Sequence, residues 1–472
     1  MPVDSLQVAH SQSNRSRDFD SEIPPTTTVD GSDASADAPS PETETGELIE
    51  MKLSKLALVA ALACGTYAGN VFADQPNDIR LVSCDCGEPV CGCEPVCDTG
   101  ACCDSGCDSA CDSCGDCFGL FDGLSCCGDC CLGDPCTLFG EYCGYSAGGW
   151  IQLGYTNQPL PAFNTLDDTL QLQQAWLYAE KAIDTSNGFD IGGRVDYVYG
   201  TDGPNTQAFG TDPRGWDNDW DNGGEYGSAL PQLYLEAGYG DISVKAGHFY
   251  TIIGYEVVPA TGNFFYSHAY TFNFSEPFTH TGVLASYTPS DDVTVWGGYS
   301  FGWDSGFDDN GDAWLGGASL GLTDKLTLIY ASVAGRFVEP WATGINERGY
   351  MQSIVADYAL TDSTNYIFQS DWLDTEDEFG NESRSTYGIN QYLLHSINDC
   401  WGVGARFEWW AAAADNLPRQ NIYALTTGIN YRPHANLIFR PEVRWDWDDD
   451  GRQFLNGDAN QTTFGVDAIL TF

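Results

Sequence analysis

From residue 148 to the C-terminus, apolar and polar side chains alternate along most of this chain. In residues 402–409, valine, alanine, phenylalanine and tryptophan alternate with glycine, arginine and glutamate. In residues 463–472, phenylalanine, valine, alanine and leucine alternate with threonine, glycine and aspartate. Such alternation predicts β-strands with one apolar and one polar face. About sixteen segments of this kind occur, each about long enough to cross a bilayer as a tilted strand. The sequence therefore predicts an all-β chain.

The connections between these segments alternate in length. The short ones lie near residues 183–188, 240–241, 289–291, 323–324, 361–362, 396–399 and 432–434, and the long ones near 157–169, 200–227, 253–277, 303–311, 334–349, 374–383, 411–420 and 446–459. Seven short turns and eight long loops give an even strand count, with both ends on the short-turn side. Because outer-membrane barrels have periplasmic turns and longer external loops, we predict a transmembrane antiparallel β-barrel over residues 144–472.

Charged residues of the predicted strands fall on their polar faces. A basic residue facing lipid at the bilayer midplane would cost roughly 2–4 kcal/mol, so the polar faces are expected to surround water. A barrel of about 16 strands is expected to leave an open channel rather than a packed core. The candidate pore-lining residues are Arg194, Asp196, Glu236, Lys245, Arg406, Glu408, Arg440, Glu442, Arg444 and Asp467. They either set the field at a constriction or form salt bridges that hold neighbouring strands in register.

The long connection at residues 253–277 is rich in aromatic residues. Its rings are Phe264, Phe265, Tyr266, Tyr270, Phe272 and Phe274. This loop either folds into the lumen and narrows it, or forms an aromatic cap outside the barrel. The sequence leaves both alternatives open.

The chain is strongly acidic, with 68 acidic and 19 basic residues. This balance excludes a nucleic-acid binder and a basic membrane-surface anchor. Two acidic loops offer weak calcium candidates, namely Asp217, Asp219 and Asp221 in one, and Asp308, Asp309 and Asp312 in the other. Neither matches the full EF-hand pattern, and solvated loops are the alternative, so we expect no cofactor. The negative mouth should concentrate cations and predicts a weak cation preference.

An export signal lies inside the chain at residues 51–73. Lys52 and Lys55 precede a short apolar run, and Val71-Phe72-Ala73 offers a small-residue cleavage site. This pattern predicts a signal peptide, and the apolar run is too short to span a membrane. The polar residues 1–50 are either a gene-model artefact or a disordered extension. A lipoprotein signal ending at Cys64 is the alternative for the cleavage site.

Residues 74–143 form a cysteine-rich segment. Seventeen of the 19 cysteines lie between Cys84 and Cys143. Disulfides are the default in an oxidising compartment. A zinc site and an iron–sulfur site on the C-x-x-C-x-x-C spacing of residues 111–117 are the alternatives. We predict an irregular periplasmic segment, which Cys400, beside a predicted short turn, could link to the barrel rim.

Four stretches resemble the OmpL-like β-barrel porin family over roughly residues 148–472. They are RVDYVYGTD at 194–202, GHFYTIIGYE at 247–256, NFFYS at 263–267 and PFTHTG at 277–282. The resemblance implies an outer-membrane porin that passes small solutes. The terminal Phe472 looks like the aromatic end that barrel-assembly machinery recognises. The cysteine-rich segment is not part of this resemblance.

The sequence thus favours a porin for passive diffusion of small hydrophilic solutes and ions. We expect the barrel to lie in outer-membrane lipid. The sequence does not decide whether the protein forms a homo-oligomer. An enzyme is not expected, since no Ser–His–acid spacing or G-x-S-x-G elbow accompanies the histidines. The alternative is a disulfide-linked structural envelope protein anchored by its barrel.

Overall fold

The computed structural model describes residues 144–208, 216–217, 220–307, 311–338, 347–414, 419–448 and 459–472, together with scattered positions from 132 to 142. The expectations for residues 1–50, for the signal peptide at 51–73 and for nearly all of the cysteine-rich segment lie outside these residues.

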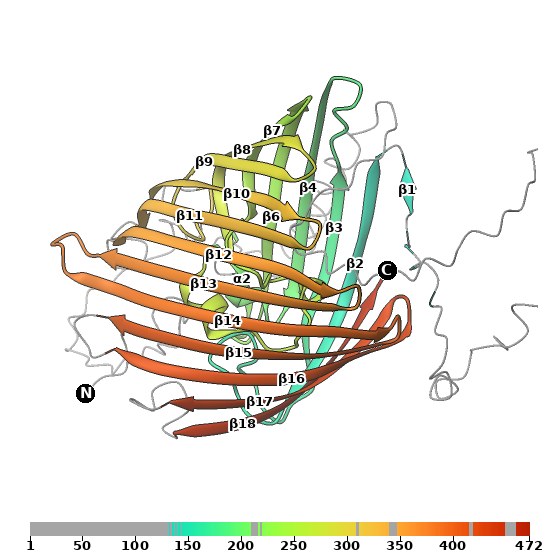
Figure 1. Cartoon of the computed structure of the whole chain (residues 1–472), viewed down its shortest axis with the longest axis vertical. Coiled ribbons are helices and arrows are strands. Elements are labelled where there is room, and N and C mark those ends of the chain that lie inside the picture. Colours follow the sequence, from blue (N-terminus) through green and yellow to red (C-terminus); the bar gives the residue numbers. More distant parts are fainter. Residues whose placement is uncertain are drawn as a thin grey trace, which may run out of the picture. The chain divides into compact units, whose positions relative to one another are not determined.

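The described chain is a ring of strands (Figure 1). Of its 18 strands, β1 (Glu141–Tyr142) and β5 (Asp221–Asn222) have only two residues each. The other 16 form the barrel wall: β2 (Tyr145–Thr156), β3 (Gln171–Lys181), β4 (Phe189–Gly200), β6 (Tyr226–Tyr239), β7 (Ile242–Tyr250), β8 (Thr279–Ser290), β9 (Val293–Ser300), β10 (Asp312–Thr323), β11 (Leu326–Val338), β12 (Glu347–Thr361), β13 (Thr364–Glu376), β14 (Glu382–Asn398), β15 (Trp401–Ala414), β16 (Gln420–His434), β17 (Leu437–Asp448) and β18 (Asn460–Thr471).

The barrel is closed and antiparallel. Each wall strand pairs with the strands before and after it, and β18 pairs with β2, where Ala468 faces Leu153. Next to this closing pair, the Phe472 amide donates to the Gly149 carbonyl at 2.9 Å, and the Gly149 amide donates back at 3.0 Å. Because the last strand pairs with the first, the wall has no free edge.

The predicted strand count and the alternation of connections are confirmed. The short turns are 182–188, 240–241, 291–292, 324–325, 362–363, 399–400 and 435–436, and the loops are 157–170, 201–225, 251–278, 301–311, 339–346, 377–381, 415–419 and 449–459. The positions agree with the sequence prediction because the period of two ends wherever a strand ends.

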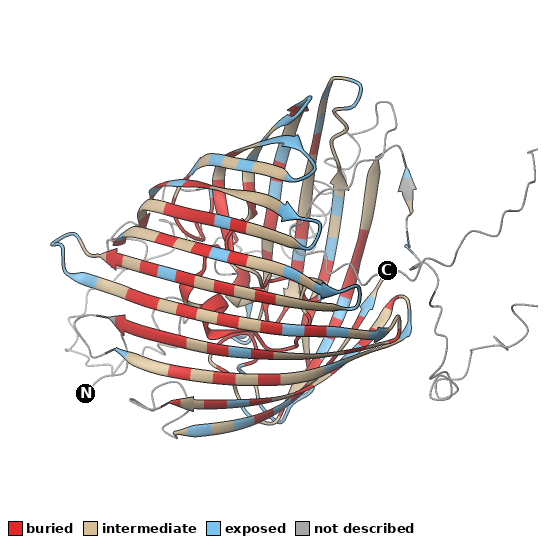
Figure 2. Cartoon of the chain, in the orientation of Figure 1, coloured by how far each residue is buried: buried red, intermediate tan, exposed pale blue. Residues whose placement is uncertain are grey.

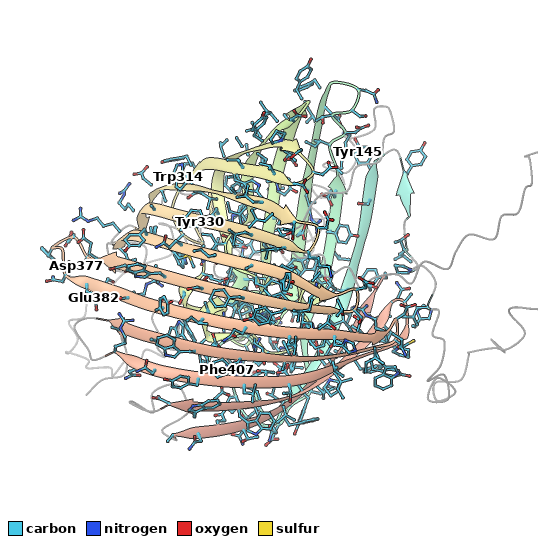
Figure 3. The ribbon with its side chains drawn as sticks, viewed as in Figure 1. Tyr145, Trp314, Tyr330, Asp377, Glu382 and Phe407 are labelled. Carbon is cyan, nitrogen blue, oxygen red and sulfur yellow. The ribbon has the colours of Figure 1, made fainter. Side chains whose placement is uncertain are left out.

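The outer face of the wall is apolar. Trp314, Tyr330 and Phe407 point outward from the strands (Figure 3) and are exposed. Buried and more exposed residues alternate along each strand (Figure 2). In the described part of the chain, no helix is long and apolar enough to cross a membrane.

The lumen is narrowed by one long loop, so the first of the two alternatives for residues 253–277 holds. Loop 251–278 turns into the barrel, carrying the short helices η2 (Ala260–Gly262) and α3 (Tyr270–Ser275). Most of its residues are buried, as Figure 2 shows for the segment enclosed by the strands. The ring radius leaves room for a channel, and a long aromatic loop occupies part of that room.

A hydrophobic core therefore lies inside the barrel rather than outside it. One cluster joins wall residues Trp150 and Trp176 to loop residues Phe163, Phe272 and Phe278. The indole rings of Trp150 and Trp176 stack with centroids 4.7 Å apart. Burial of these rings removes apolar surface from water and fixes the loops to the wall.

Candidate functional site: the constriction inside the barrel

Arg440 on β17 holds the start of the infolded loop. Its Nη1 donates to the carbonyl oxygens of Ala260 at 2.8 Å and of Asn263 at 2.6 Å. Its Nε and Nη2 donate to the two carboxylate oxygens of Asp467 on β18. The guanidinium is almost fully buried, so this planar fork joins two strands and the loop.

Two wall glutamates bind consecutive backbone amides of the loop. The Glu442 carboxylate accepts from the amides of residues 266 and 267, at 2.9 and 3.1 Å. The Glu408 carboxylate on β15 accepts from the amides of residues 270 and 271, at 2.8 and 2.7 Å. Glu408 thereby satisfies the free N–H groups at the start of α3. In a strand, these loop amides would donate to the carbonyl groups of a neighbouring strand. Here the carboxylates of Glu442 and Glu408 accept their hydrogen bonds instead.

A buried ion pair lies at the centre of the constriction. Arg406 on β15 donates from Nη1 to Glu256 Oε1 at 2.5 Å and to the Ser267 carbonyl at 2.7 Å. Glu256 also accepts from the Tyr392 hydroxyl at 3.1 Å and lies 3.3 Å from His268 Nδ1. Since Glu256 and His268 belong to the loop and Arg406 to the wall, the pair anchors the loop.

The electrostatics of this pair favour a charged carboxylate. Burial alone would raise the pKa of Glu256, but the Arg406 charge and the His268 hydrogen bond outweigh burial and hold the pKa at about 2. Burial lowers the pKa of His268, against the opposing effect of Glu256. Near neutral pH the site therefore contains one carboxylate, one guanidinium and a neutral imidazole.

Arg444 forms a third contact between wall and loop. Its Nε donates to Asp446 at 2.8 Å, and its Nη1 donates to the His268 carbonyl at 2.6 Å. The guanidinium carbon also lies 4.7 Å from the Tyr270 ring centroid. Each of the three wall arginines thus binds a carboxylate and a loop carbonyl together.

Glycines on the inner face make room for the loop's aromatic rings. A Cβ atom would lie 2.5 Å from the Phe264 ring at Gly404, 3.3 Å from the Phe265 ring at Gly428 and 2.9 Å from the Tyr266 ring at Gly465. Three consecutive loop residues thus lie against glycines of β15, β16 and β18. Any larger residue would meet a ring rather than open space.

The end of the loop is held by carboxyl groups. Gln369 on β13 donates from Nε2 to Glu276 at 2.6 Å and to Asp371 at 2.8 Å. Burial and the neighbouring Asp371 raise the pKa of Glu276 well above its ordinary value. Asp304 accepts from the amides of residues 278 and 279, at 2.6 and 2.8 Å. The loop is therefore fixed at its start, middle and end.

The tip of loop 157–170 closes over the infolded loop. The Phe163 ring lies with its centroid 4.8 Å from His268, 5.7 Å from Phe272 and 5.4 Å from Phe278. Phe163 is buried although its loop begins and ends at the barrel rim. Two loops therefore meet inside the lumen.

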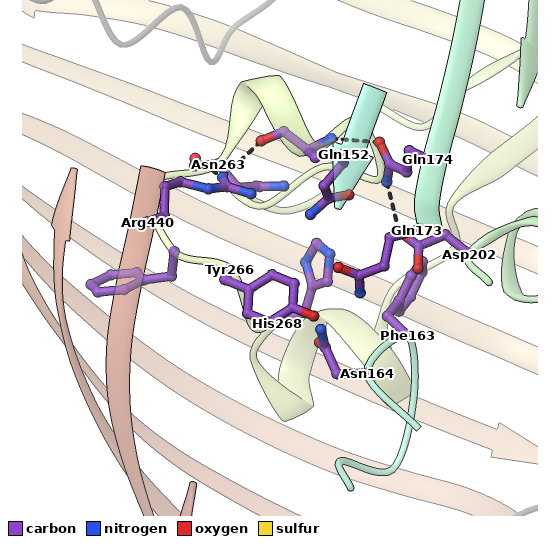
Figure 4. A pocket seen from close by; sticks show the side chains of 12 residues that line it. Gln152, Phe163, Asn164, Gln173, Gln174, Asp202, Asn263, Tyr266, His268 and Arg440 are labelled. Carbon is purple, nitrogen blue, oxygen red and sulfur yellow. Dashed lines mark hydrogen bonds between the residues drawn. The ribbon is translucent and has the colours of Figure 1, made fainter. Parts of the chain in front are cut away.

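A narrow pocket lies where these loops face β2 and β3 (Figure 4). It is lined by Gln152, Phe163, Asn164, Gln173, Gln174, Asp202, Ala260, Asn263, Phe265, Tyr266, His268 and Arg440. Gln174 spans the pocket edge, since its Nε2 donates to Asp202 and to the Val258 carbonyl, both at 2.8 Å. Amide side chains of the wall therefore meet the aromatic tips of both loops.

The ten predicted pore-lining residues fall into two groups. Arg406, Glu408, Arg440, Glu442, Arg444 and Asp467 belong to the constriction, where all are buried. The remaining four lie across the lumen on β4, β6 and β7. There Arg194 donates to Asp196 and to Glu180 of β3, and Glu236 faces Lys245 in register. The Lys245 ammonium lies 4.2 Å from the Tyr234 ring centroid.

The calcium candidates have protein partners where they are described. Asp217 is buried and accepts from the amides of residues 208 and 230, at 2.9 and 2.8 Å. Asp221 accepts from Gln207, and Asp312 pairs with Arg336 and the Tyr299 hydroxyl. Asp219, Asp308 and Asp309 lie outside the described residues. Within the described ranges, no three His, Cys, Asp or Glu side chains gather as a metal site.

Sequence reasoning did not identify the amide side chains or Glu256 as part of the site. Gln171, Gln173 and Gln174 are unusual in a strand that crosses a membrane, and this clustering was an available signal. Glu256 carried no such signal, because its partner Arg406 lies 150 positions further along the chain.

A closed barrel of 16 antiparallel strands, apolar outside and narrowed inside by an infolded loop, defines the class of outer-membrane β-barrel porins. The model of the family described as beta-barrel porin-2, OmpL-like, matches residues 144–472. The chain belongs to this family. The resemblance in the sequence is thereby confirmed.

Several solved structures of outer-membrane proteins are similar to the chain at low sequence identity. OmpT, an outer-membrane protein of Vibrio cholerae in trimer form, is 12% identical with a TM-score of 0.46, covering 70% of this chain and 99% of that one. The outer-membrane channel DcaP of Acinetobacter baumannii is 10% identical with a TM-score of 0.47, covering 71% and 100%. The anion-selective porin from Comamonas acidovorans is 10% identical with a TM-score of 0.46, covering 70% and 99%. No functionally curated protein matches the chain.

Proposed function

We propose that this protein lets small hydrophilic solutes and ions diffuse passively across the outer membrane. The observation that carries the proposal is the inner wall, where charged and amide side chains surround a constriction formed by loop 251–278. The chain also belongs to the OmpL-like porin family, and a ring of 16 strands is wide enough to enclose a water-filled path. The same loop narrows the lumen and sets the size limit for passage.

The acidic loops support a weak cation preference. The long loops near residues 217–221, 308–312 and 374–382 are rich in aspartate and glutamate, while the constriction arginines are paired with carboxylates. Cations should therefore accumulate at the mouth without meeting an unpaired positive charge near the middle of the barrel.

Planar-bilayer recordings test both statements. We expect stepwise openings from the purified full-length chain, and reversal potentials in a KCl gradient that favour potassium. Anion-selective reversal potentials would refute the cation preference. A folded barrel without openings would refute the porin role.

A disulfide-linked envelope role is the second candidate, because Cys400 in the turn between β14 and β15 is disulfide-bonded. Every other cysteine precedes residue 144. The Cys400 disulfide therefore lies within one chain, and a structural protein would need further disulfides to neighbouring chains. Reducing agent should then release the protein from large envelope complexes, whereas a porin without such links would migrate unchanged.

We also propose that the chain is exported by the segment 51–73 and that the cysteine-rich segment faces the periplasm. Cleavage after Ala73 would make Asp74 the first mature residue. Terminal sequencing of protein purified from outer membranes should find that residue. A mature chain that starts at Cys64 would instead support the lipoprotein alternative.

A further inference from the structure

Two carboxyl groups meet where the end of the infolded loop touches the wall. Glu276 belongs to the loop, Asp371 belongs to β13, and both are at most 2% exposed. The two carboxyl groups hydrogen-bond to each other. The Gln369 amide donates from one nitrogen to both groups, at 2.6 and 2.8 Å. The Ser353 hydroxyl donates to Asp371 at 2.6 Å, so this carboxyl pair joins the loop to β12 and β13.

The contact between the two carboxyl groups requires a proton. An ionised carboxylate only accepts hydrogen bonds, whereas a protonated carboxyl group also donates one. Glu276 Oε2 is buried, and no amide or hydroxyl among the described residues donates to it. Two ionised carboxylates in direct contact would repel each other strongly in a buried site. The pair therefore shares at least one proton while the loop is docked.

No positive charge compensates the pair. Within the described ranges, neither of its carboxyl groups forms an ion pair with a basic side chain. Arg384 of β14 is bound to Glu347 instead. Arg406 of β15 is bound to Glu256, and the Glu256 carboxylate adds a negative charge that opposes ionisation of Glu276.

The other elements around the pair bring uncharged groups. The sequence of α3, YTFNFS, has no charged side chain, and β12 contributes the Ser353 hydroxyl. The Tyr392 hydroxyl of β14 interacts with Glu276 and donates to Glu256 at 3.1 Å. A tyrosine ordinarily ionises only near pH 10. The shared proton is therefore the group whose loss most directly changes the charge between loop and wall.

The pair also connects the end of the loop to its start. Gly254 has a φ of +88°, and a Cβ atom at this position would overlap the Glu276 carboxyl group. A glycine is required there both for the backbone conformation and for the space. Release of Glu276 would therefore loosen the loop at both of its ends.

We propose that this carboxyl pair is a proton-dependent switch that keeps loop 251–278 docked and releases it at alkaline pH. The inference rests on the proposed porin function and adds a control of the same constriction. As pH rises, the pair loses its shared proton to water, and the two carboxylates repel each other across the contact between loop and wall.

The direction of the effect follows from the linkage between protonation and docking. Burial and the neighbouring Asp371 raise the pKa of Glu276 above its ordinary value of 4.5. A raised pKa gives a stabilisation that is complete below pH 4.5 and is lost as pH rises to the raised value. One proton changes the equilibrium between docked and released loop by up to about tenfold per pH unit.

Chymotrypsin cleavage within residues 251–278 and single-channel currents test the switch on the full-length protein, between about pH 6 and pH 10. Glu276→Gln is the reference variant, because its amide still donates to Asp371 but cannot ionise. Relative to this variant at each pH, we expect wild-type cleavage to become roughly tenfold faster across the range. The wild-type current should rise over the same range, and the variant current should stay flat.

Two further variants sharpen the test. Asp371→Asn offers a donor even to an ionised Glu276, so it should also flatten the pH profile. Glu236→Gln is the matched control, because Glu236 lies on the wall strand β6 and accepts from Ser243 rather than from the loop. This control should keep the wild-type profile. Heat-modifiable migration on gels checks that each variant folds.

Identical pH profiles of the wild type and Glu276→Gln would overturn the switch while leaving the porin function intact. Faster cleavage at pH 6 than at pH 10, relative to the same variant, would overturn it as well. Absence of current from folded protein at every pH would refute the porin function itself, and the cleavage profile would still decide whether the pair holds the loop.

Discussion

At the scale of single residues, the constriction is held by buried charges that each have several partners. Arg406 is fully buried and binds a carboxylate, a backbone carbonyl and the hydroxyls of Ser267 and Thr426. Such a group is costly to leave unpaired. The loop position should therefore depend on individual side chains of the wall.

Substitution of one partner should release the loop. Glu256→Gln leaves the Arg406 guanidinium buried without its carboxylate, and we expect a loss of roughly 3 kcal/mol in the free energy of unfolding. Urea titration of the folded barrel measures the loss, and single-channel conductance should rise. The exposed rim pair offers the control, since Glu376→Gln removes only the partner of Arg348 and should cost about 1 kcal/mol or less.

Acid should weaken the same contact. The pKa of Glu256 is held at about 2, below its ordinary value of 4.5, so the carboxylate stabilises the loop above pH 4.5 and loses this effect as pH falls toward 2. His268 acts in the same direction, because its buried ring resists protonation. Conductance should therefore rise as pH falls below 4.5. A conductance that is flat or falls between pH 4.5 and pH 2 would contradict this assignment.

At the scale of elements, the aromatic rings of loop 251–278 pack against glycines on the inner face of the wall. Phe264 lies against Gly404 of β15, where a Cβ atom would also come within 2.9 Å of Leu394. The wall is thus shaped for this loop at positions far apart in the sequence.

A larger residue at this position should displace the loop. Gly404→Val would push against the Phe264 ring, and we expect a cost of about 1–3 kcal/mol with faster proteolysis of residues 251–278. Gly297→Val is the matched control, because a Cβ atom at Gly297 on β9 meets nothing within 4 Å. Equal proteolysis rates in the two variants would show that the glycine does not position the loop.

Strands and turns could be predicted from the sequence because their signal is local. Apolar alternation marks each strand, and its interruption marks each turn, as at Gly240 and Asp241. The sequence could not decide whether loop 251–278 folds into the lumen or forms a cap outside the barrel. The position of the loop depends on contacts with Arg406, Arg440 and the inner glycines. These residues are far from the loop in the sequence and come close to it only in the closed barrel.

The candidate residues show the same limit. The alternation of apolar and polar residues placed Arg440 and Glu442 on the polar face of their strand. It could not show that both are buried against the loop. The amide side chains were missed although the cluster Gln171, Gln173 and Gln174 in one predicted strand was a signal for them.

At the scale of the whole molecule, a wide ring of strands encloses a narrow interior. The 16-stranded wall could enclose an aqueous channel, whereas loops 157–170 and 251–278 meet across it. The molecule therefore combines a wide scaffold with a small constriction, and the loop sets the limit for passage.

The most direct test compares single-channel currents of the full chain with those of a variant whose residues 254–275 are replaced by a short glycine-serine linker. We expect small stepwise openings from the wild type and several-fold larger currents from the variant at equal salt and voltage. Equal currents from the two folded proteins, or no openings from either, would contradict a pore that is constricted by this loop.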